Sequence, residues 1–197
     1  MNHSLLIATR NAHKTREIAL ILGEHFQVTD LTAHPEIPAT VESGSTFLEN
    51  ATLKAVEASL LFEGLVLSDD SGLEVDALGG APGVYSARYA GENADDAANR
   101  RRLLEELARV DARGKARTAR FHCVMVLAER GKVIDAFDGA VEGIIINQEK
   151  GEGGFGYDPL FVPEGFCETF AQLPDTAKNG ISHRGRALEK VRSYLLR

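Results

Sequence analysis

The sequence is poor in cysteine and has no long apolar run. Its two cysteines, Cys123 and Cys167, lie far apart, and neither belongs to a C-x-x-C pair. A zinc site or a disulfide framework is therefore not expected. Cys123 stands inside an apolar run, so we expect it to be a small core residue. The longest apolar runs fall far short of the roughly 20 residues that a membrane-spanning helix needs.

The chain also lacks a long block of basic residues. Its net charge is −7, which argues against binding polymeric nucleic acid through a basic face. Residues Met1–Ser4 lack the basic start and apolar stretch of a signal peptide, so we expect a cytoplasmic protein that binds no membrane. The 197 residues, 44% hydrophobic and 26% charged, are enough for one large globular domain or two small lobes.

Several common catalytic motifs are missing from the sequence. It contains no G-x-x-x-x-G-K-[ST], no G-x-S-x-G and no H-E-x-x-H. Residues 151–156 formally match G-x-G-x-x-G, but Asp158-Pro159 and an apolar stretch follow them. A dinucleotide-binding fingerprint requires a helix at that point. We therefore reject that interpretation.

The most distinctive feature that is present is an acidic pair behind an apolar run. Leu65–Leu67 leads directly into Ser68–Gly72, which contains Asp69 and Asp70. An apolar run bounded by Gly and Asp is typical of a buried strand, and we expect the strand to end at the acidic residues. Ligands of open α/β sheets bind outside the carboxyl ends of strands, so this pair is a candidate cation or phosphate site. The alternative is a polar turn whose side chains bond their own backbone.

Apolar periodicity and turn residues predict an α/β beginning followed by an antiparallel sheet. The predicted strands are 4–8, 27–31, 118–127, 133–137 and 140–146, and the predicted helices are 14–22, 46–62, 95–110 and a last one after Gly185. Thr46 and Glu49 match a capping box at the start of the second helix.

Polar residues recur where these elements begin and end. Thr9–Lys14 spans a strand-to-helix junction, which is suited to an anion; the alternative is an ordinary helix cap with a solvated lysine. Glu49, Asn50 and Lys54 share one side of a helix; they either line a site or form a solvated face with an internal ion pair.

Two later segments also carry candidate residues. Glycines flank Phe155, which would allow close backbone approach and offers a ring for stacking; the alternative is a glycine-rich turn. Lys178, His183 and Arg184 gather near a helix N-terminus, where positive charge is unfavourable unless an anion or carbonyl binds there. The alternative is a helix with a loosely basic start.

Together these side chains suit phosphoryl or nucleotidyl chemistry, in which positioning and charge neutralisation supply most of the catalysis. Candidates for phosphate binding are Thr9, Asn11, Lys14, Lys54 and Arg184, and candidates for holding Mg²⁺ are Glu42, Glu49, Asp69 and Asp70.

Five segments in this order resemble the inosine triphosphate pyrophosphatase family, and they cover nearly the whole chain. They are residues 9–14, 42–54, 68–89, 153–161 and 178–187. The resemblance implies an α/β fold, with an elongated two-lobed mixed sheet flanked by helices around a central cleft. It implies a single domain over residues 1–197, a second lobe of about 84–147, and a homodimer. It also implies Mg²⁺-dependent hydrolysis of dITP, ITP, XTP and dXTP to monophosphate and pyrophosphate, which keeps deaminated purines out of DNA and RNA.

The resemblance assigns roles to individual residues. Asp70 matches the general base and metal ligand, Glu42 a second metal ligand, and Ser71 a substrate contact. Asp69 is expected to be structural, holding the turn that orients Asp70. The other expected substrate-binding residues are the phosphate segment Thr9, Arg10, Asn11, Ala12, His13 and Lys14, then Lys54, the base-binding loop Phe155, Gly156, Tyr157 and Asp158, then Lys178, and the purine-reading pair His183 and Arg184. Arg10 departs from the family, in which many members have a small residue.

Donors on His183 and Arg184 would favour a 6-oxo purine over the 6-amino group of ATP. The exclusion of GTP does not follow from these residues. Two other interpretations remain open at this level: a pyrophosphatase for pyrimidine or modified triphosphates, and a nucleotide-sensing module.

Overall fold

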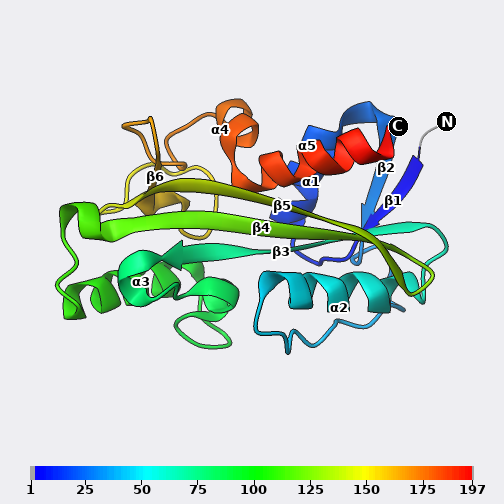
Figure 1. The fold of residues 1–197 in the computed structure, drawn as a ribbon, viewed down its shortest axis with the longest axis horizontal. Helices are drawn as coiled ribbons and strands as arrows, with labels where there is room; N and C mark the ends of the chain where they lie inside the picture. The colour runs from blue at the N-terminus through cyan, green and yellow to red at the C-terminus, as the bar shows by residue number, and fades with distance from the viewer. Residues whose placement is uncertain (1–2, 197) are drawn as a thin grey trace. The chain divides into compact units, whose positions relative to one another are not determined.

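The computed structural model describes residues 3–196 as a mixed sheet flanked by helices. Six strands are ordered β2-β1-β3-β4-β5-β6 (Figure 1), and this confirms the predicted α/β class. Met1 and Asn2, on which the expectation of no signal peptide partly rests, lie outside the described residues. Among residues 3–196, no helix combines the length and the apolar character needed to cross a bilayer.

The chain divides into two compact units. Unit 1 comprises residues 1–70, 123–139 and 184–197, and unit 2 comprises residues 71–122 and 140–183. Three long strands contribute residues to both units: β3 (Leu65–Val75), β4 (Thr118–Glu129) and β5 (Lys132–Ile145). The second unit overlaps the predicted lobe of about 84–147 without coinciding with it, and a single catalytic domain stays a prediction.

Unit 1 begins with a parallel arrangement of short strands. β1 (His3–Ile7) pairs in parallel with both β2 (Phe26–Asp30) and β3. Helix α1 (Ala12–Leu22) connects β1 to β2, followed by the 3-10 helix η1 (Gly23–His25). The predicted strands at 4–8 and 27–31 are confirmed within a residue or two.

Alternation along β1 places helices on both faces of this part of the sheet. Leu5 and Ile7 belong to the core cluster that includes residues of α1 and of α5 (His183–Leu195). Leu6 points the other way, into a cluster with Ala58 of α2 (Phe47–Ser59). A strand buried on both faces reads as a continuous apolar run, which is why the sequence marks it so clearly.

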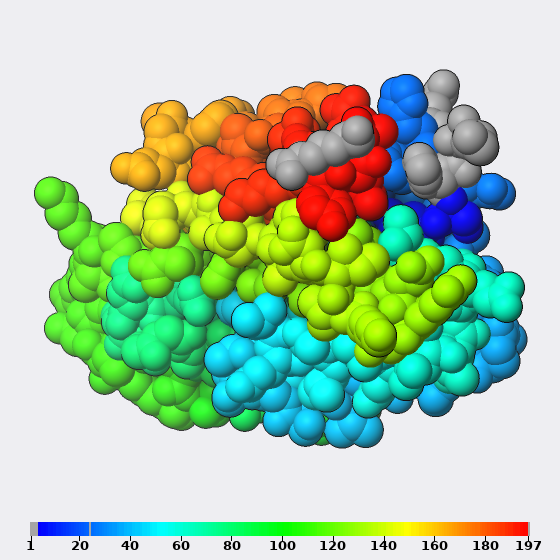
Figure 2. Space-filling model, turned by 45° about the vertical axis from the view of Figure 1, so that its right-hand side comes forward, coloured from blue at the N-terminus to red at the C-terminus, as the bar shows by residue number. Residues whose placement is uncertain are grey.

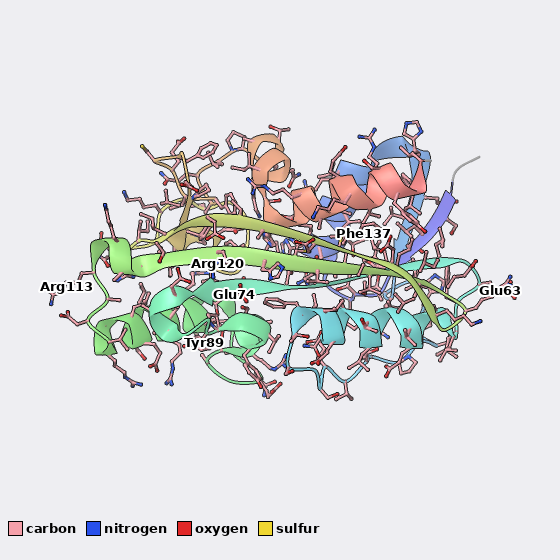
Figure 3. The ribbon with its side chains drawn as sticks, in the orientation of Figure 1. Glu63, Glu74, Tyr89, Arg113, Arg120 and Phe137 are labelled. Atoms are coloured by element: carbon pink, nitrogen blue, oxygen red, sulfur yellow. The ribbon has the colours of Figure 1, made fainter. Side chains whose placement is uncertain are left out.

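Strands β4 and β5 form a hairpin through Arg130 and Gly131, both with positive φ (50° and 75°), as a two-residue hairpin turn requires. Gly131 N donates to Ser59 Oγ at 3.0 Å, and in Figure 2 this green-yellow hairpin lies against the end of α2. Phe137 of β5 packs edge-on against Tyr194 of α5, with ring centroids 5.6 Å apart (Figure 3).

The prediction of separate β runs at 133–137 and 140–146 is wrong, because β5 continues through both. The reason is that β5 pairs with the long strand β4, and this pairing outweighs the weak strand propensity of Asp138 and Gly139.

Unit 2 packs helix α3 (Asp96–Arg109) against the other ends of the long strands. Its core contains Leu103 and Leu107 of α3 together with Phe121 and Phe161. The edge strand β6 (Phe161–Pro163) is antiparallel to β5. Short helices complete the unit: α4 (Asp175–Ile181) and the 3-10 helices η2 (Asp76–Leu78), η3 (Gly83–Arg88), η4 (Gly114–Arg117) and η5 (Asp158–Leu160).

In unit 2 the side chains of β4 alternate between buried and more exposed positions. Arg120 points away from the core (Figure 3) and pairs with Asp76 at 2.9 Å and with Glu142 at 3.0 Å, whereas Phe121 is buried. The helix predicted at 95–110 is also confirmed, with Asp95 accepting from Ala98 N as its N-cap. Helix α4 was not predicted, because seven residues are too few to show a helical period.

Candidate functional site

The acidic pair lies in the middle of a strand and not in a turn. β3 runs from Leu65 to Val75 without interruption, so the predicted strand end and the polar-turn alternative at 68–72 are both wrong. Both acidic residues are buried, with only 1% of Asp69 and 6% of Asp70 exposed. Two adjacent carboxylates inside a sheet require cationic partners, and neighbouring strand residues point to opposite faces. Each carboxylate therefore needs its own set of partners.

Asp69 is the centre of a buried ion cluster. Its carboxylate accepts from the Lys14 ammonium, from Arg184 Nε at 2.9 Å and from Cys123 Sγ at 3.2 Å. The Arg184 guanidinium also donates to the Glu17 carboxylate. Burial raises the pKa of Asp69, but the charges of Arg184 and Lys14 outweigh it and hold that pKa well below 3.8. Asp69 is therefore a fixed counter-charge for Lys14 and Arg184, and the turn that it was expected to hold is replaced by the continuous strand β3.

Asp70 faces a different cation. Lys54 Nζ donates to Asp70 Oδ1 at 2.7 Å and to Glu42 Oε1 at 2.9 Å. It also donates to the backbone carbonyl of Asp69 at 2.8 Å. On the other oxygen, Asn50 Nδ2 lies 3.5 Å from Asp70 Oδ2. One lysine thus contacts both of the carboxylates that the family resemblance assigns to a metal ion.

Burial and charge act in opposite directions on this pair. Burial raises the pKa of Asp70, and the charge of Lys54 offsets only part of that rise. Burial lowers the pKa of Lys54, but the negative charges of Asp70 and Glu42 outweigh it and raise that pKa. A carboxylate with a raised pKa that keeps its lysine partner charged is suited to accepting a proton.

Local structure at the start of α2 positions Asn50 and Lys54. Thr46 and Glu49 form the predicted capping box, in which Glu49 N donates to Thr46 Oγ1 and Thr46 N donates to Glu49 Oε2. Glu49 therefore serves the cap and not the acidic cluster. Gly44 N donates to Asn50 Oδ1 at 2.8 Å, and a Cβ on Gly44 would lie 2.6 Å from Glu49 Cβ. Only glycine allows this approach, which holds the segment carrying Glu42 against the helix.

The strand-to-helix junction at 9–14 forms as predicted. Asn11 is the N-cap of α1, and its side chain accepts from His13 N and Lys14 N at 3.0 and 3.4 Å. Thr9 Oγ1 accepts from Asn11 N at 3.2 Å, and Ala12 opens the helix. The Arg10 guanidinium donates to two backbone carbonyls in the 31–37 loop, both at 2.7 Å. Arg10 thus braces that loop, and its phosphate contact stays a prediction.

The two carboxylates that contact Lys54 fit Mg²⁺ when the substrate supplies the remaining ligands. Within the described residues, no three His, Cys, Asp or Glu side chains are arranged to hold a metal ion. Mg²⁺, however, is usually held by one or two carboxylates together with water and phosphate oxygens. Asp70 and Glu42 provide two carboxylates within reach of one ammonium group.

Unit 2 contains a second group of predicted residues, organised by Asp158. Its Oδ2 accepts from Phe155 N at 2.9 Å and from Lys178 Nζ at 2.8 Å. Lys178 Nζ also lies 5.1 Å from the centre of the Phe155 ring. The 155–158 loop is therefore closed on itself, with a buried lysine beside its aromatic residue.

Tyr157 and His183 have packing partners of their own in unit 2. Tyr157 Oη donates to Ser86 O at 2.8 Å, and burial raises the pKa of its hydroxyl. His183 is the first residue of α5, and its ring stacks on Phe121 with centroids 4.9 Å apart and an angle of 12°. It is buried. Because α5 begins at His183, the prediction that the last helix begins after Gly185 is wrong. Ser71 directly follows Asp70 and is half-buried.

The predicted residues therefore fall into two groups. Unit 1 brings together Lys14, Glu42, Lys54, Asp70 and Arg184, and unit 2 brings together Phe155, Asp158 and Lys178. Sequence reasoning missed Glu17 as a partner of Arg184 and Phe121 as the support of His183. Glu17 stands one turn after Lys14 on the same helix, a spacing that places both on one side and marks it as a second charge at this site.

Comparisons with known proteins show which family this chain resembles over its length. A model of the Ham1 family matches residues 5–194. The dITP/XTP pyrophosphatase of Desulforamulus reducens is 48% identical over 194 residues, which is 98% of this chain and 96% of the relative. The dITP/XTP pyrophosphatase of Exiguobacterium sibiricum is 50% identical over 192 residues, covering 97% and 96%.

A solved structure has the same fold. The HAM1 protein of Coxiella burnetii superposes with a TM-score of 0.89 at 39% identity, covering 100% of this chain and 99% of that one. These matches confirm the resemblance that the five sequence segments suggested. With nearly its whole length matched, the chain belongs to the Ham1 family.

Proposed function

We propose that this chain hydrolyses deaminated purine nucleoside triphosphates, dITP, ITP, XTP and dXTP, to the monophosphate and pyrophosphate. The observation that carries the proposal is the sharing of Lys54 Nζ by the carboxylates of Asp70 and Glu42, at 2.7 and 2.9 Å. The relatives that match nearly the whole chain are dITP/XTP pyrophosphatases, and they supply the substrate class.

In this proposal Asp70 is the general base and Asp70 and Glu42 are the residues that hold Mg²⁺. When bound, Mg²⁺ would neutralise charge on the triphosphate and its leaving pyrophosphate. The Asp70 carboxylate orients the attacking water and takes its proton as the bond to the leaving pyrophosphate breaks. Lys54 stays protonated throughout, because two carboxylates raise its pKa.

Phosphate binding is proposed for the segment 9–14 at the start of α1, together with Lys54. Thr9, Asn11, Ala12 and His13 offer hydroxyl and backbone groups at the start of a helix, where anions are stabilised. Lys14 is held in place by Asp69, so its ammonium is available in one position without an ordering cost at each binding event. Arg10 and Lys54 complete the proposed phosphate set.

Recognition of the purine is proposed for the unit 2 loop, with the residue pair that begins α5. Phe155 offers the stacking surface, Gly156 and Tyr157 shape the loop, and Asp158 with Lys178 closes it. His183 and Arg184 provide hydrogen-bond donors for the base. A 6-oxo group can accept from them, whereas the 6-amino group of ATP is itself a donor and cannot. Ser71 is a further substrate contact.

The experiment that tests the proposal measures products and substrate choice together. Purified protein with Mg²⁺ is expected to release pyrophosphate from ITP and XTP much faster than from ATP, GTP or dTTP, and to lose this activity when a chelator removes the metal. Inorganic phosphate as the first product would overturn the reaction, and a preference for dTTP would overturn the substrate class. Nucleotide binding without any turnover would instead indicate a sensing module.

The proposal also includes a homodimer in the cytoplasm that acts on small nucleotides and binds neither nucleic acid polymers nor membranes. Light scattering of the purified protein tests the oligomeric state, since a monomer at working concentrations would contradict it.

A further inference from the structure

Helix α3 holds the glycine-rich loop of unit 2 through both backbone polar groups of one residue, Gly156. Gly156 N donates to Asp96 Oδ2 at 2.7 Å, and Arg100 Nη1 donates to Gly156 O at 2.8 Å. Asp96 and Arg100 stand one helical turn apart, so their side chains lie on the same side of α3. Together the two side chains hydrogen-bond both the N–H and the C=O of Gly156.

The loop needs such a support because its glycine-rich backbone is costly to order. Gly151, Gly154 and Gly156 all have positive φ, at 84°, 71° and 61°. Glycine loses more conformational freedom on ordering than any other residue, so a loop with three such positions is costly to fix. Charge-assisted hydrogen bonds are the stronger kind and can offset that cost.

A second contact extends the hold along the loop. Arg100 Nε lies 2.8 Å from Glu149 Oε1, so the same guanidinium contacts Glu149, ahead of the three glycines, and Gly156, the last of them. The Arg100 side chain is 14% exposed and that of Glu149 is 42% exposed, and ion pairs that reach solvent contribute little. The hydrogen bonds to Gly156 therefore provide most of the support for the loop, and this ion pair adds to them.

A third side chain of α3, that of Asn99, fixes the helix against another segment of unit 2. Asn99 Oδ1 accepts from Ala90 N at 2.8 Å and Asn99 Nδ2 donates to Ala87 O at 3.1 Å. The segment that contains Ala87 and Ala90 also contacts the glycine-rich loop, because Tyr157 Oη donates to Ser86 O. The loop is thus fixed on two sides, by α3 directly and by the η3 segment that α3 holds.

We propose that Asp96 and Arg100 are positioning residues for purine recognition: they hold Gly156 so that the neighbouring Phe155 ring stands ready for the base. This inference rests on the proposed function, because it assigns the loop to base binding. Both side chains bind the base-recognition loop, so we expect both to act on affinity and selectivity and not on the chemical step.

The test compares two truncations with conservative variants and a control on the same helix. Asp96→Ala and Arg100→Ala are expected to raise KM for ITP about tenfold, with kcat changed by less than about threefold. They should also reduce the preference for ITP over ATP. Asp96→Asn keeps an oxygen that can accept from Gly156 N, and Arg100→Lys keeps the charge, so both should recover much of the loss. Arg101→Ala removes an exposed charge from the same helix and should leave KM unchanged.

A measurement without substrate separates this inference from the proposed function. Amide hydrogen exchange at Gly156 should be faster in Asp96→Ala than in the wild type, since the amide loses its acceptor. If the variants fold and show wild-type exchange, KM and selectivity, the positioning inference is overturned although the proposed function stands. If wild-type protein releases no pyrophosphate from ITP, the proposed function fails, and the inference about purine recognition fails with it.

Should the alanine variants not fold, the conservative pair decides. Asp96→Asn and Arg100→Lys must then give KM values between those of the wild type and a tenfold increase, and values equal to wild type in both would contradict the inference.

Discussion

Asp69 and Asp70 are neighbours in one buried strand, yet their carboxylates bind different cations. Asp69 is held by Lys14 and Arg184, whereas Asp70 is held by Lys54. The alternation of the strand separates them, and the two environments move their pKa values in opposite directions: that of Asp69 is lowered and that of Asp70 is raised. Two carboxylates with divergent pKa values suit one structural and one chemical role.

Replacing the proposed base should remove activity without unfolding the protein. Asp70→Asn keeps the shape of the side chain but cannot accept a proton, so we expect pyrophosphate release from ITP to fall by about 10²–10⁴-fold. Nucleotide affinity, measured by calorimetry, should remain measurable. A variant with a rate near that of the wild type would show that Asp70 is not the base.

Replacing Asp69 should instead affect stability. Asp69→Asn leaves Lys14 and Arg184 short of a buried counter-charge, which we expect to lower the free energy of unfolding by about 3–5 kcal/mol. Urea denaturation provides the measurement. The control is Asp138→Asn, which removes a carboxylate from an exposed pair with Lys190 and should change stability by less than about 1 kcal/mol. Equal effects of the two substitutions would contradict the assigned role of the cluster.

The low pKa of Asp69 also predicts an acid-sensitive contribution to stability. Its carboxyl group titrates near 3.8 in the unfolded chain and well below that in the folded protein. The unfolded state therefore binds the proton first, and the stabilisation is complete above pH 3.8 and is lost as the pH falls toward the folded pKa.

The difference in unfolding free energy between wild type and Asp69→Asn should accordingly shrink as the pH is lowered below about 4. Urea titrations over a series of acidic buffers would measure it. A difference that stays constant, or that grows toward low pH, would mean that the Asp69 pKa is not depressed by folding.

Alanine substitutions at two glycines of unit 2 should distinguish the cost of steric crowding from the cost of backbone strain. Gly154 has φ +71°, and a Cβ there would lie 2.1 Å from Asp158 Oδ2; Gly165 has φ +84° and open space around it. Gly165→Ala should cost about 1–2 kcal/mol for the left-handed backbone alone. Gly154→Ala should cost about 1–3 kcal/mol more through overpacking. Thermal unfolding measures both, and a Gly154 variant no less stable than the Gly165 variant would show that the loop can move away from Asp158.

Local sequence was sufficient wherever residues close in the chain interact with one another. Asn11 and Thr46 cap their helices, Gly23 ends α1, and Asp95 begins α3, all as the residues predict. Such caps depend on side chains within three or four positions of the backbone groups they satisfy. The five segments that carry the family resemblance were likewise sufficient to indicate the family.

Whether the residues around the acidic pair form a turn or a strand was decided by the tertiary structure alone. Local rules predict a turn at Ser68–Gly72, because Asp, Ser and Gly favour turns. β3 continues through it since Lys14 and Arg184, 55 and 115 positions away in the chain from Asp69, bring positive charge to the buried carboxylate. A strand can bury a carboxylate only when a cation arrives from elsewhere in the fold, and no window of sequence around residue 69 contains that information.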